Sequence, residues 1–493
     1  MTALTRRAAG VAGERAGAAG PALGRAGRNA AIVVAFLAVY ALFAPQVMRS
    51  LAPLTGDEPF YVVTALTIWR DHTLDETKSY AERYYDAFYP PDPLPVDWQG
   101  WTSFPRDLPP HATHSIRPGL YSKHGLGVAL LILPAWVLGA RAGAVWLLNL
   151  VAALVALNVY LLARRYTRDW RWAAAIAVPL ALSNPLMSYA YLIFPEMFAA
   201  LAIVYAFRRS REGRNNALQW LLVGGCLALL PWLHARFIPA VLGLALALLP
   251  GWLRERSWGR RLAAVVPPVL AGLALLAFYQ WLYGRPLPNA EDHAGFSDLW
   301  GTVNGFFGLF LDEQWGLVIY TPLYLLGLAS LAHFWRRRRE DFTALLLVVA
   351  PYLLLVAFYR VWWGEWGPPA RYLAPVAPLI AAPLAAWVAD KRPAFAAAAL
   401  ALAALPGLLV MGAFLVAPQI MYNQPDGHSA LFTAWAAQLD RPWPKIIPSF
   451  QFYALSPLAL RLPWSLALAW SIVAPFLGGW TRDAAAPEAD DGA

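Results

Sequence analysis

Long apolar segments separated by short charged ones dominate the pattern of the chain. Segments such as AIVVAFLAVYALFA, FTALLLVVAPYLLLVAFY and AFAAAALALAALPGLLVMGAFLVA contain no charged residue. A helix needs about 20 such residues to cross the hydrocarbon core of a bilayer. The pattern therefore predicts an all-α polytopic integral membrane protein, with about 12 or 13 transmembrane helices and with external loops and juxtamembrane helices. One apolar piece, residues 125–140, is broken by Pro134, and we expect that it does not span the membrane fully.

Composition and charge agree with a membrane protein. Of the 493 residues, 59% are hydrophobic and 14% are charged, whereas soluble domains carry about 25% charged residues. The net charge of +9 comes from basic clusters between apolar runs, which is an orientation signal rather than a nucleic-acid-binding surface. We expect no nucleic-acid partner. The single cysteine, Cys226, excludes an intrachain disulfide.

The basic clusters predict the topology, because Lys and Arg concentrate in cytoplasmic loops. Assigning every cluster to the cytoplasm places four long loops outside: residues 49–123, 284–314, 361–371 and 417–462. Residues 1–29 are expected to form a disordered cytoplasmic tail, residues 30–480 one transmembrane domain, and residues 481–493 a second cytoplasmic tail. The expected location is the plasma or inner membrane, with a cytoplasmic N-terminus and the site on the external face.

Polar motifs interrupt the apolar pattern at the predicted external ends of helices. Charged side chains near lipid are functional by default, because they are costly there. The alternative for each acid is helix capping, and for each base it is extension of the side chain to the membrane surface. The residues are Asp57 and Glu58 in GDEP, Lys123 and His124 in YSKHG, Glu196 in IFPEM, and His234 and Arg236 in PWLHAR.

Two further external motifs add acids and aromatic rings. They are FLDEQWGL, with Asp312 and Glu313, and WWGEWGPPAR, with Trp363, Glu365, Trp366 and Arg371. Aromatic residues are common in membrane-interface belts, but their faces also stack on sugar rings. Together the motifs predict an external cavity lined by carboxylates, cations and aromatic rings. Such a cavity would suit a polyprenyl-phosphate sugar, because its phosphate could meet Arg or Lys while its tail lies between helices.

The chain resembles the GT-C type membrane glycosyltransferases that use lipid-linked donors, such as protein mannosyltransferases and the aminoarabinose transferase of lipid A. Those enzymes carry an acidic pair in the first external loop, where this chain has GDE. The chain is more similar still to a bacterial subgroup that shares the GDEPxY start, the PE and PWLHxR hairpin tips, a D-x-Q-x-G-L segment and a W-G-x-W-x-P-x-R loop. The resemblance covers residues 31 to about 388. Two motifs depart from it: KHGLG replaces the mannosyltransferase HPPLG, and DEQ inserts an acid.

The resemblance implies an enzyme that transfers a sugar from a polyprenyl-phosphate donor to a lipid, glycan or protein acceptor, with inversion at the anomeric carbon. Asp57 would be the general base, with Glu58 orienting or capping beside it. The donor phosphate is expected at Lys123, His124, His234, Arg236 and Arg371, and the sugar or acceptor at Glu196, Asp312, Glu313, Trp363, Glu365 and Trp366. No cofactor is required by these residues. Some relatives bind a divalent metal and others do not, so the metal is left open here.

Two other classes of function stay open. A transporter or flippase for a lipid-linked sugar would need charges buried at mid-membrane and related halves, whereas these apolar segments are nearly free of charge and show no repeat. A polymer ligase or membrane scaffold of envelope glycan assembly would use a large external loop. It would not need GDE so close to the first helix.

Overall fold

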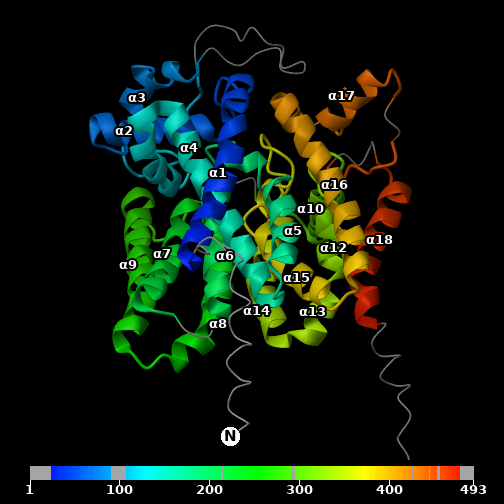
Figure 1. Cartoon of the computed structure of the whole chain (residues 1–493). Helices are drawn as coiled ribbons and strands as arrows, with labels where there is room; N and C mark the ends of the chain where they lie inside the picture. Colours follow the sequence, from blue (N-terminus) through cyan, green and yellow to red (C-terminus); the bar gives the residue numbers. More distant parts are fainter. Residues whose placement is uncertain are drawn as a thin grey trace, which may run out of the picture.

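The computed structural model describes residues 24–89, 107–212, 215–289, 295–424, 426–442, 445–451 and 456–477. Within these residues the protein is all-α, and its only extended pairings are two isolated bridges, Ala112 with Ser122 and Phe296 with Tyr359. Figure 1 shows the helices packed into one bundle. The fold is therefore that of an all-α polytopic membrane protein, as the sequence predicts.

The helices of the first half of the chain are α1 (Arg25–Ser50), α2 (Glu58–Asp71), α3 (Thr77–Ala81), α4 (Leu126–Tyr166), α5 (Trp170–Ala181), α6 (Pro195–Arg211), α7 (Ala217–Leu233), α8 (Ile238–Arg254) and α9 (Trp258–Tyr283). Those of the second half are α10 (Leu299–Leu311), α11 (Leu317–Tyr320), α12 (Leu323–Ala329), α13 (Leu331–Arg337), α14 (Arg339–Phe358), α15 (Ala381–Ala389), α16 (Pro393–Val416), α17 (Ala430–Gln438) and α18 (Leu458–Leu477). Short 3₁₀ helices connect them: η1 (Tyr84–Ala87), η2 (Ser188–Tyr191), η3 (Ala235–Phe237), η5 (Arg371–Leu373), η6 (Ala377–Ile380) and η7 (Pro418–Met421).

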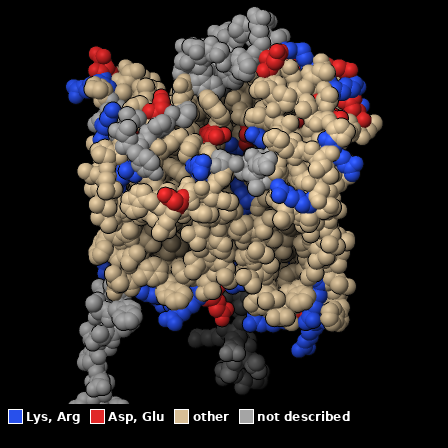
Figure 2. Space-filling model, turned by 180° about the vertical axis from the view of Figure 1, so that it is seen from behind, with Lys and Arg blue, Asp and Glu red and all other residues tan. Residues whose placement is uncertain are grey.

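Seven helices in the described part of the chain are long and apolar enough to cross a membrane: α1, α4, η3 with α8, α9, α14, α16 and α18. Three shorter apolar segments are Ala217–Leu233, Leu299–Leu311 and Ala377–Ala389. The long helices expose leucine to the surroundings; Leu270 on α9 is 61% exposed and Leu402 on α16 is 75% exposed. Large outward apolar surfaces of this kind are favourable in lipid and unfavourable in water. Figure 2 shows the corresponding belt, which is nearly free of charged side chains.

Helix α4 combines the predicted short apolar piece with a full-length one. The backbone leaves the helical conformation at Gly139 and Ala140. A side chain at Gly143 would lie 2.0 Å from the carbonyl oxygen of Ala135, so the two pieces meet closely across this kink. The piece before the kink begins at Leu126 and, at about 1.5 Å per residue, is too short to cross a hydrocarbon core of about 30 Å. This agrees with the expectation that residues 125–140 do not span fully.

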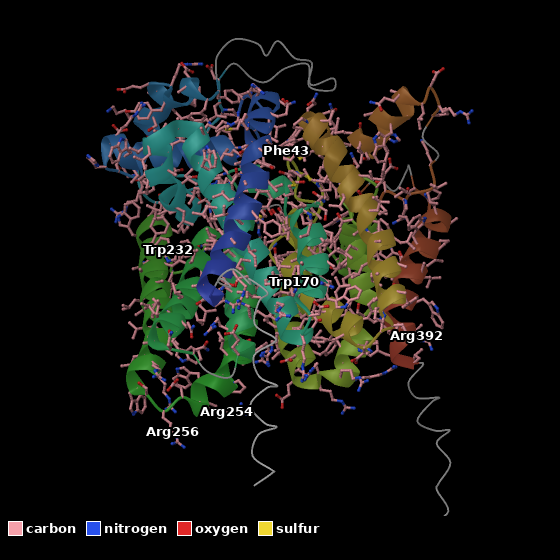
Figure 3. All side chains as sticks on the ribbon, viewed as in Figure 1. Phe43, Trp170, Trp232, Arg254, Arg256 and Arg392 are labelled. Carbon is pink, nitrogen blue, oxygen red and sulfur yellow. The ribbon has the colours of Figure 1, made fainter. Side chains whose placement is uncertain are left out.

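Parts of the two sets of loops lie at opposite ends of the bundle, although α10, from the predicted external loop 284–314, lies within the bundle. Helices α2, α3 and α17, from the loops predicted to be external, lie at the top of Figure 1. Arg254, Arg256 and Arg392, from the basic clusters, lie at the bottom of Figure 3. The alternation of basic clusters therefore separates the loops into two faces; which face is cytoplasmic stays a prediction.

The predicted tails lie mostly outside the described residues. Residues 1–23 and 478–493 are not described. Helix α1 begins at Arg25, five residues before the boundary expected from the sequence, and where the membrane-spanning part of it starts stays a prediction.

Candidate functional site

Four charged side chains from distant parts of the chain form one continuous network. The guanidinium of Arg371, in η5, donates from Nη2 to the carboxylate of Asp57, at the start of α2. Its Nε donates to Glu196 Oε1, in the first turn of α6, over 3.1 Å. Arg236, in η3, donates to the same Glu196 oxygen over 2.6 Å. The order is therefore Asp57, Arg371, Glu196, Arg236, and we call this set the charge network.

The charge network is buried at one end and open at the other. The side chain of Glu196 is fully buried, Arg371 is 6% exposed, and Asp57 is 25% exposed. The guanidinium of Arg371 also donates to the carbonyl of Gly364 over 2.8 Å and lies over the ring of Phe194. A molecule that approaches from the surface would therefore meet Asp57 before it meets Arg371. Figure 2 shows acidic and basic side chains around a recess in this half of the molecule.

Local structure decides against simple helix capping for the two acids in the network. Asp57 occupies the N-cap position of α2, with Pro59 in the first turn, but its side chain makes no capping hydrogen bond. Glu196 lies in the first turn of α6, after Pro195, and its carboxylate contacts two arginines, Arg236 and Arg371. Proline and acidic residues favour these helix starts. The carboxylates themselves, however, are turned toward arginine.

The glycine of GDEP allows Asp57 to reach Arg371. Gly56 has a φ of 62°, a left-handed conformation that favours glycine. A Cβ at this position would lie 2.7 Å from the carbonyl oxygen of Trp366. The first external loop can therefore pack directly against the WWGEWGPPAR loop only because residue 56 lacks a side chain.

Burial and neighbouring charges shift the pKa values of the adjacent acids Asp57 and Glu58 in opposite directions. Burial alone would raise the pKa of Asp57, but the charges of Arg371, His124 and Arg236 outweigh it and hold the pKa below its usual range. Burial raises the pKa of Glu58 to about 7, because Arg141 and the backbone N–H of Ile193 offset it only in part. Asp57 is thus a carboxylate at neutral pH, whereas Glu58 titrates near neutrality.

Glu58 is buried away from the charge network. Its Oε1 accepts a hydrogen bond from the backbone N–H of Ile193 over 2.8 Å. Its other oxygen, Oε2, is buried with no hydrogen-bond partner among the described residues. The two neighbouring acids therefore have separate surroundings, as expected for consecutive positions at a helix start.

Arg141 belongs to these surroundings and was not singled out from the sequence. It donates to the carbonyl oxygens of Met48 over 2.9 Å and Leu51 over 2.7 Å, at the end of α1. Its charge also acts on Glu58. A lone arginine in the apolar run VLGARAGAVW was the available signal, because intramembrane charges are functional candidates by default.

Lys123, His124 and His234 line a second, small cleft of about 50 Å³. The His124 Nε2 lies 3.3 Å from Nδ1 of His111, and both imidazoles stack with Phe60. The charge of His124 acts on Asp57, which connects this cleft electrostatically to the charge network. His111 is a further residue that the sequence motifs did not indicate. Burial lowers its pKa to about 4, so it is neutral at physiological pH.

Asp312 and Glu313 are held in a different environment. Oδ1 of Asp312 accepts from the backbone N–H groups of Gln314 and Trp315, and Oδ2 accepts from Phe450. Glu313 accepts from the backbone N–H of Ser429 over 3.2 Å. Among the described residues neither carboxylate pairs with Arg236 or Arg371. The contacts of Asp312 are those of a buried loop anchor, so its expected role at a sugar gains no support from geometry.

The remaining predicted residues lie on the loop that carries Arg371. Trp363 is partly buried, Trp366 is 40% exposed, and Glu365 is exposed. The carbonyl of Trp366 faces Gly56. Trp366 therefore lies beside the Asp57 end of the charge network, where an aromatic face could border a ligand.

The carboxylates of the charge network are occupied by arginine. Among the described residues, no group of three or more His, Cys, Asp and Glu side chains is arranged to hold a metal ion. The guanidinium of Arg371 lies between Asp57 and Glu196 and contacts both carboxylates.

The fold and the site define an all-α polytopic membrane protein with a buried, charge-balanced network below one face. No protein-family model matches the chain, and no curated protein matches it. Among solved structures, the chain is similar to the oligosaccharyltransferase of Archaeoglobus fulgidus in its apo form, with a TM-score of 0.43 and 14% sequence identity. That likeness covers 87% of this chain and 64% of the other, so the chain spans less than two-thirds of the length of that protein.

Proposed function

We propose that the protein is a membrane glycosyltransferase that moves a sugar from a polyprenyl-phosphate donor to an acceptor hydroxyl on the external face. The observation that carries the proposal is the shared guanidinium of Arg371, which contacts both Asp57 and Glu196. A transfer of this kind needs a carboxylate to accept the acceptor's proton and a cation to meet the leaving phosphate. The charge network supplies both groups in direct contact.

In the proposed reaction, the acceptor oxygen attacks the anomeric carbon of the donor from the face opposite the phosphate. The bond between that carbon and the phosphate oxygen breaks, and polyprenyl phosphate leaves with the electron pair. The proton of the acceptor hydroxyl passes to Asp57. One displacement inverts the configuration at the anomeric carbon, because no carboxylate forms a covalent intermediate.

Arg371 links substrate binding to the basicity of Asp57. In the ion pair the carboxylate is ionised but weakly basic, because Arg371 stabilises its charged form. A phosphate drawn to Arg371 would compete with Asp57 for the guanidinium and would thereby raise the basicity of Asp57. Glu196 would meanwhile hold Arg371 and Arg236 in place, since it is fully buried and contacts both.

The small cleft lined by Lys123, His124 and His234 gives the phosphate a second set of donors. Lysine offers a point charge and arginine a planar fork, so the two can bind different oxygens of one phosphate. The exposed leucines of the long helices border lipid, which would let the polyprenyl tail remain in the membrane. We propose that the donor enters from the bilayer and the acceptor from outside.

The test compares Asp57→Asn with wild type in nanodiscs supplied with radiolabelled polyprenyl-phosphate hexoses and pentoses. Loss of a general base lowers turnover by about 100-fold or more, whereas donor binding should remain nearly intact. Glu58→Gln is the matched variant at the next position and should retain more turnover. Wild-type turnover in Asp57→Asn would remove this residue from catalysis, and helix initiation would then be the better account of GDEP.

A further inference from the structure

A large polar cleft lies at the end of the bundle opposite the charge network. Its volume is about 1100 Å³. Its lining comes from the C-terminal ends of α4, α6 and α8, from the N-terminal ends of α7, α9 and α14, and from α13. Arg254 and Arg256, which line it, lie at the bottom of Figure 3, away from α2 and α3. The cleft is therefore separate from the proposed site of sugar transfer.

The charges that line this cleft are unbalanced. Seven arginines and four carboxylates line it. Three of the four carboxylates lie near an arginine: Glu212 contacts Arg209, Asp341 lies 3.5 Å from Arg211, and Glu255 lies 3.6 Å from Arg260. Arg254 and Arg256 form no ion pair within the described residues. The cleft thus retains cationic side chains that the protein itself does not neutralise.

Arg209 adds an incompletely paired arginine to the lining of this cleft. Its side chain is only 7% exposed, and it contacts Glu212 through Nη1. Its Nε is buried with no hydrogen-bond partner among the described residues. Buried polar donors are nearly always paired in folded proteins, and an arginine fork suits phosphate oxygens in particular. The Nε of Arg209 is therefore an unpaired donor in the wall of a cationic cleft.

One wall of the cleft is apolar and continues onto the surface of α8. Leu246 lines the cleft and is 53% exposed. Leu249 and Leu253 follow along α8 and are 42% and 57% exposed. A ligand with a charged head and an aliphatic tail could place its head among the arginines and its tail along these leucines. A small soluble anion would use the arginines but not this wall.

We propose that this cleft binds the phosphate headgroup of an anionic phospholipid from the adjacent leaflet. Basic pockets between membrane helices recognise such headgroups. The assignment of a headgroup site to this cleft rests on the arginines that the protein does not neutralise, on the unpaired donor of Arg209 and on the adjoining leucine surface. The proposal concerns binding at the arginine-rich face and is independent of the sugar-transfer reaction.

The test measures lipid binding by native mass spectrometry on the delipidated full-length protein. Phosphatidylglycerol, phosphatidylcholine and inorganic pyrophosphate are titrated separately against wild type and against Arg254→Ala/Arg256→Ala. The matched control is Lys391→Ala/Arg392→Ala, which removes two exposed cations from the same face outside the cleft. We expect the cleft variant to bind phosphatidylglycerol about 10- to 30-fold more weakly, from the usual contribution of two cations.

The arms of the experiment separate four accounts. Selective loss of phosphatidylglycerol in the cleft variant, with the control unchanged, supports the proposal. An equal loss in the control would reduce the effect to diffuse attraction by a basic surface and overturn it. Equal binding of phosphatidylcholine would remove the role of headgroup charge. Binding of pyrophosphate as tight as that of phosphatidylglycerol would show a site for a soluble anion rather than for a lipid.

Discussion

Arg371 and Asp57 lie 314 positions apart in the chain, yet the guanidinium of one contacts the carboxylate of the other. The contact joins the loop between α1 and α2 to η5, which follows α14. Because Arg371 also contacts Glu196, it links two carboxylates in an environment where it is itself only 6% exposed. The pair is thus both a tertiary link and the centre of the proposed chemistry.

Replacing Arg371 by alanine should destabilise the protein and abolish sugar transfer. Breaking a buried ion pair by removing one partner costs about 3–5 kcal/mol, because the remaining charge is left uncompensated. Arg371→Lys should restore part of the stability and little of the activity, since one ammonium cannot reproduce the two contacts of the fork. Thermal unfolding in detergent and transfer assays measure the two effects.

A double-mutant cycle isolates the pair itself. Adding Asp57→Asn to Arg371→Ala should cost less than the sum of the single changes, because the asparagine no longer leaves a charge unpaired. Arg360→Ala is the control, since Arg360 is exposed at the start of the same loop, and such a change should stay within about 0.5 kcal/mol. Strict additivity of Asp57→Asn and Arg371→Ala would mean that the ion pair has no energetic role.

The buried acid Glu58 should make stability decrease as pH rises. Its pKa is 4.5 in the unfolded chain and about 7 in the folded protein. Between these values the folded state binds the extra proton, so this stabilisation is complete below pH 4.5 and is lost as pH rises through 7. The shift corresponds to a loss of about 3 kcal/mol at most. Melting temperatures at pH 5 and pH 7.5 give the measurement.

Glu58→Gln supplies the comparison for this pH effect. Glutamine keeps the shape without the ionisation, so the decline between pH 5 and pH 7.5 should be smaller in the variant. It should not vanish, because burial also raises the pKa of Glu76 and Glu313 to about 7. Identical pH dependence in wild type and Glu58→Gln would show that Glu58 is not protonated in the folded protein.

Gly56→Ala tests whether the first external loop must pack directly on the Trp366 backbone. A new Cβ would lie 2.7 Å from the Trp366 carbonyl oxygen, at a φ that L-residues rarely adopt. We expect a loss of about 1–3 kcal/mol in stability and a fall in turnover, since the displaced loop carries Asp57. Gly272→Ala is the control because a Cβ there meets nothing within 4 Å. Similar melting temperatures and turnover in both variants would contradict this packing role.

The site could be predicted from the sequence as a set of motifs but not as a network. GDEP, IFPEM, PWLHAR and the WWGEWGPPAR loop each stood out because a charge or glycine interrupts an apolar pattern. Those motifs supply Asp57, Glu196, Arg236 and Arg371, which the structure brings into contact. Which acid meets which arginine depends on tertiary packing, and local patterns do not contain that information.

The same limit explains why the sequence did not distinguish acids of the site from acids that hold a loop in place. Asp312 stands before a helix in an external loop, as Asp57 does, yet its partners are backbone N–H groups. Arg141 and His111 lacked a recognisable motif and became visible only through their neighbours. Helix existence was predictable from apolar length, because that signal is local. The kink inside α4, at Gly139 and Ala140, ends the short apolar piece that the sequence predicts, whereas the close approach of Gly143 to Ala135 across it is tertiary packing that the sequence does not reveal.

Cysteine labelling should establish which end of the bundle faces outward. Single cysteines in a Cys226→Ser background at residues 284–289 and 426–430 should react with an impermeant maleimide in intact cells. Cysteines replacing Arg336 or Arg338 should react only after permeabilisation, because basic clusters favour the cytoplasm. Labelling of the arginine positions from outside would invert the topology and would place the charge network on the cytoplasmic side.

Substitution of Asp312 tests whether this acid binds a ligand or anchors a loop. It is fully buried and holds the backbone of Phe450 at 2.6 Å and that of Gln314 at 2.8 Å. Asp312→Ala should leave these donors unsatisfied, at about 1–3 kcal/mol for each. We expect a lower melting temperature and faster hydrogen exchange at residues 448–451, with Asp312→Asn intermediate because it retains one carbonyl acceptor.

Donor binding then decides the role of Asp312. If Asp312 is a loop anchor, its replacement by asparagine should leave the affinity for polyprenyl-phosphate sugars within about twofold once the loop is folded, because none of its hydrogen bonds among the described residues reaches the charge network. Glu365→Gln is the reference change at an exposed acid of the Arg371 loop, where surface substitutions alter stability by about 0.5 kcal/mol or less. If Asp312→Asn instead lost donor affinity at unchanged melting temperature and unchanged exchange at residues 448–451, the carboxylate would have to contact the ligand directly, and the sugar-binding role expected from the sequence would be restored.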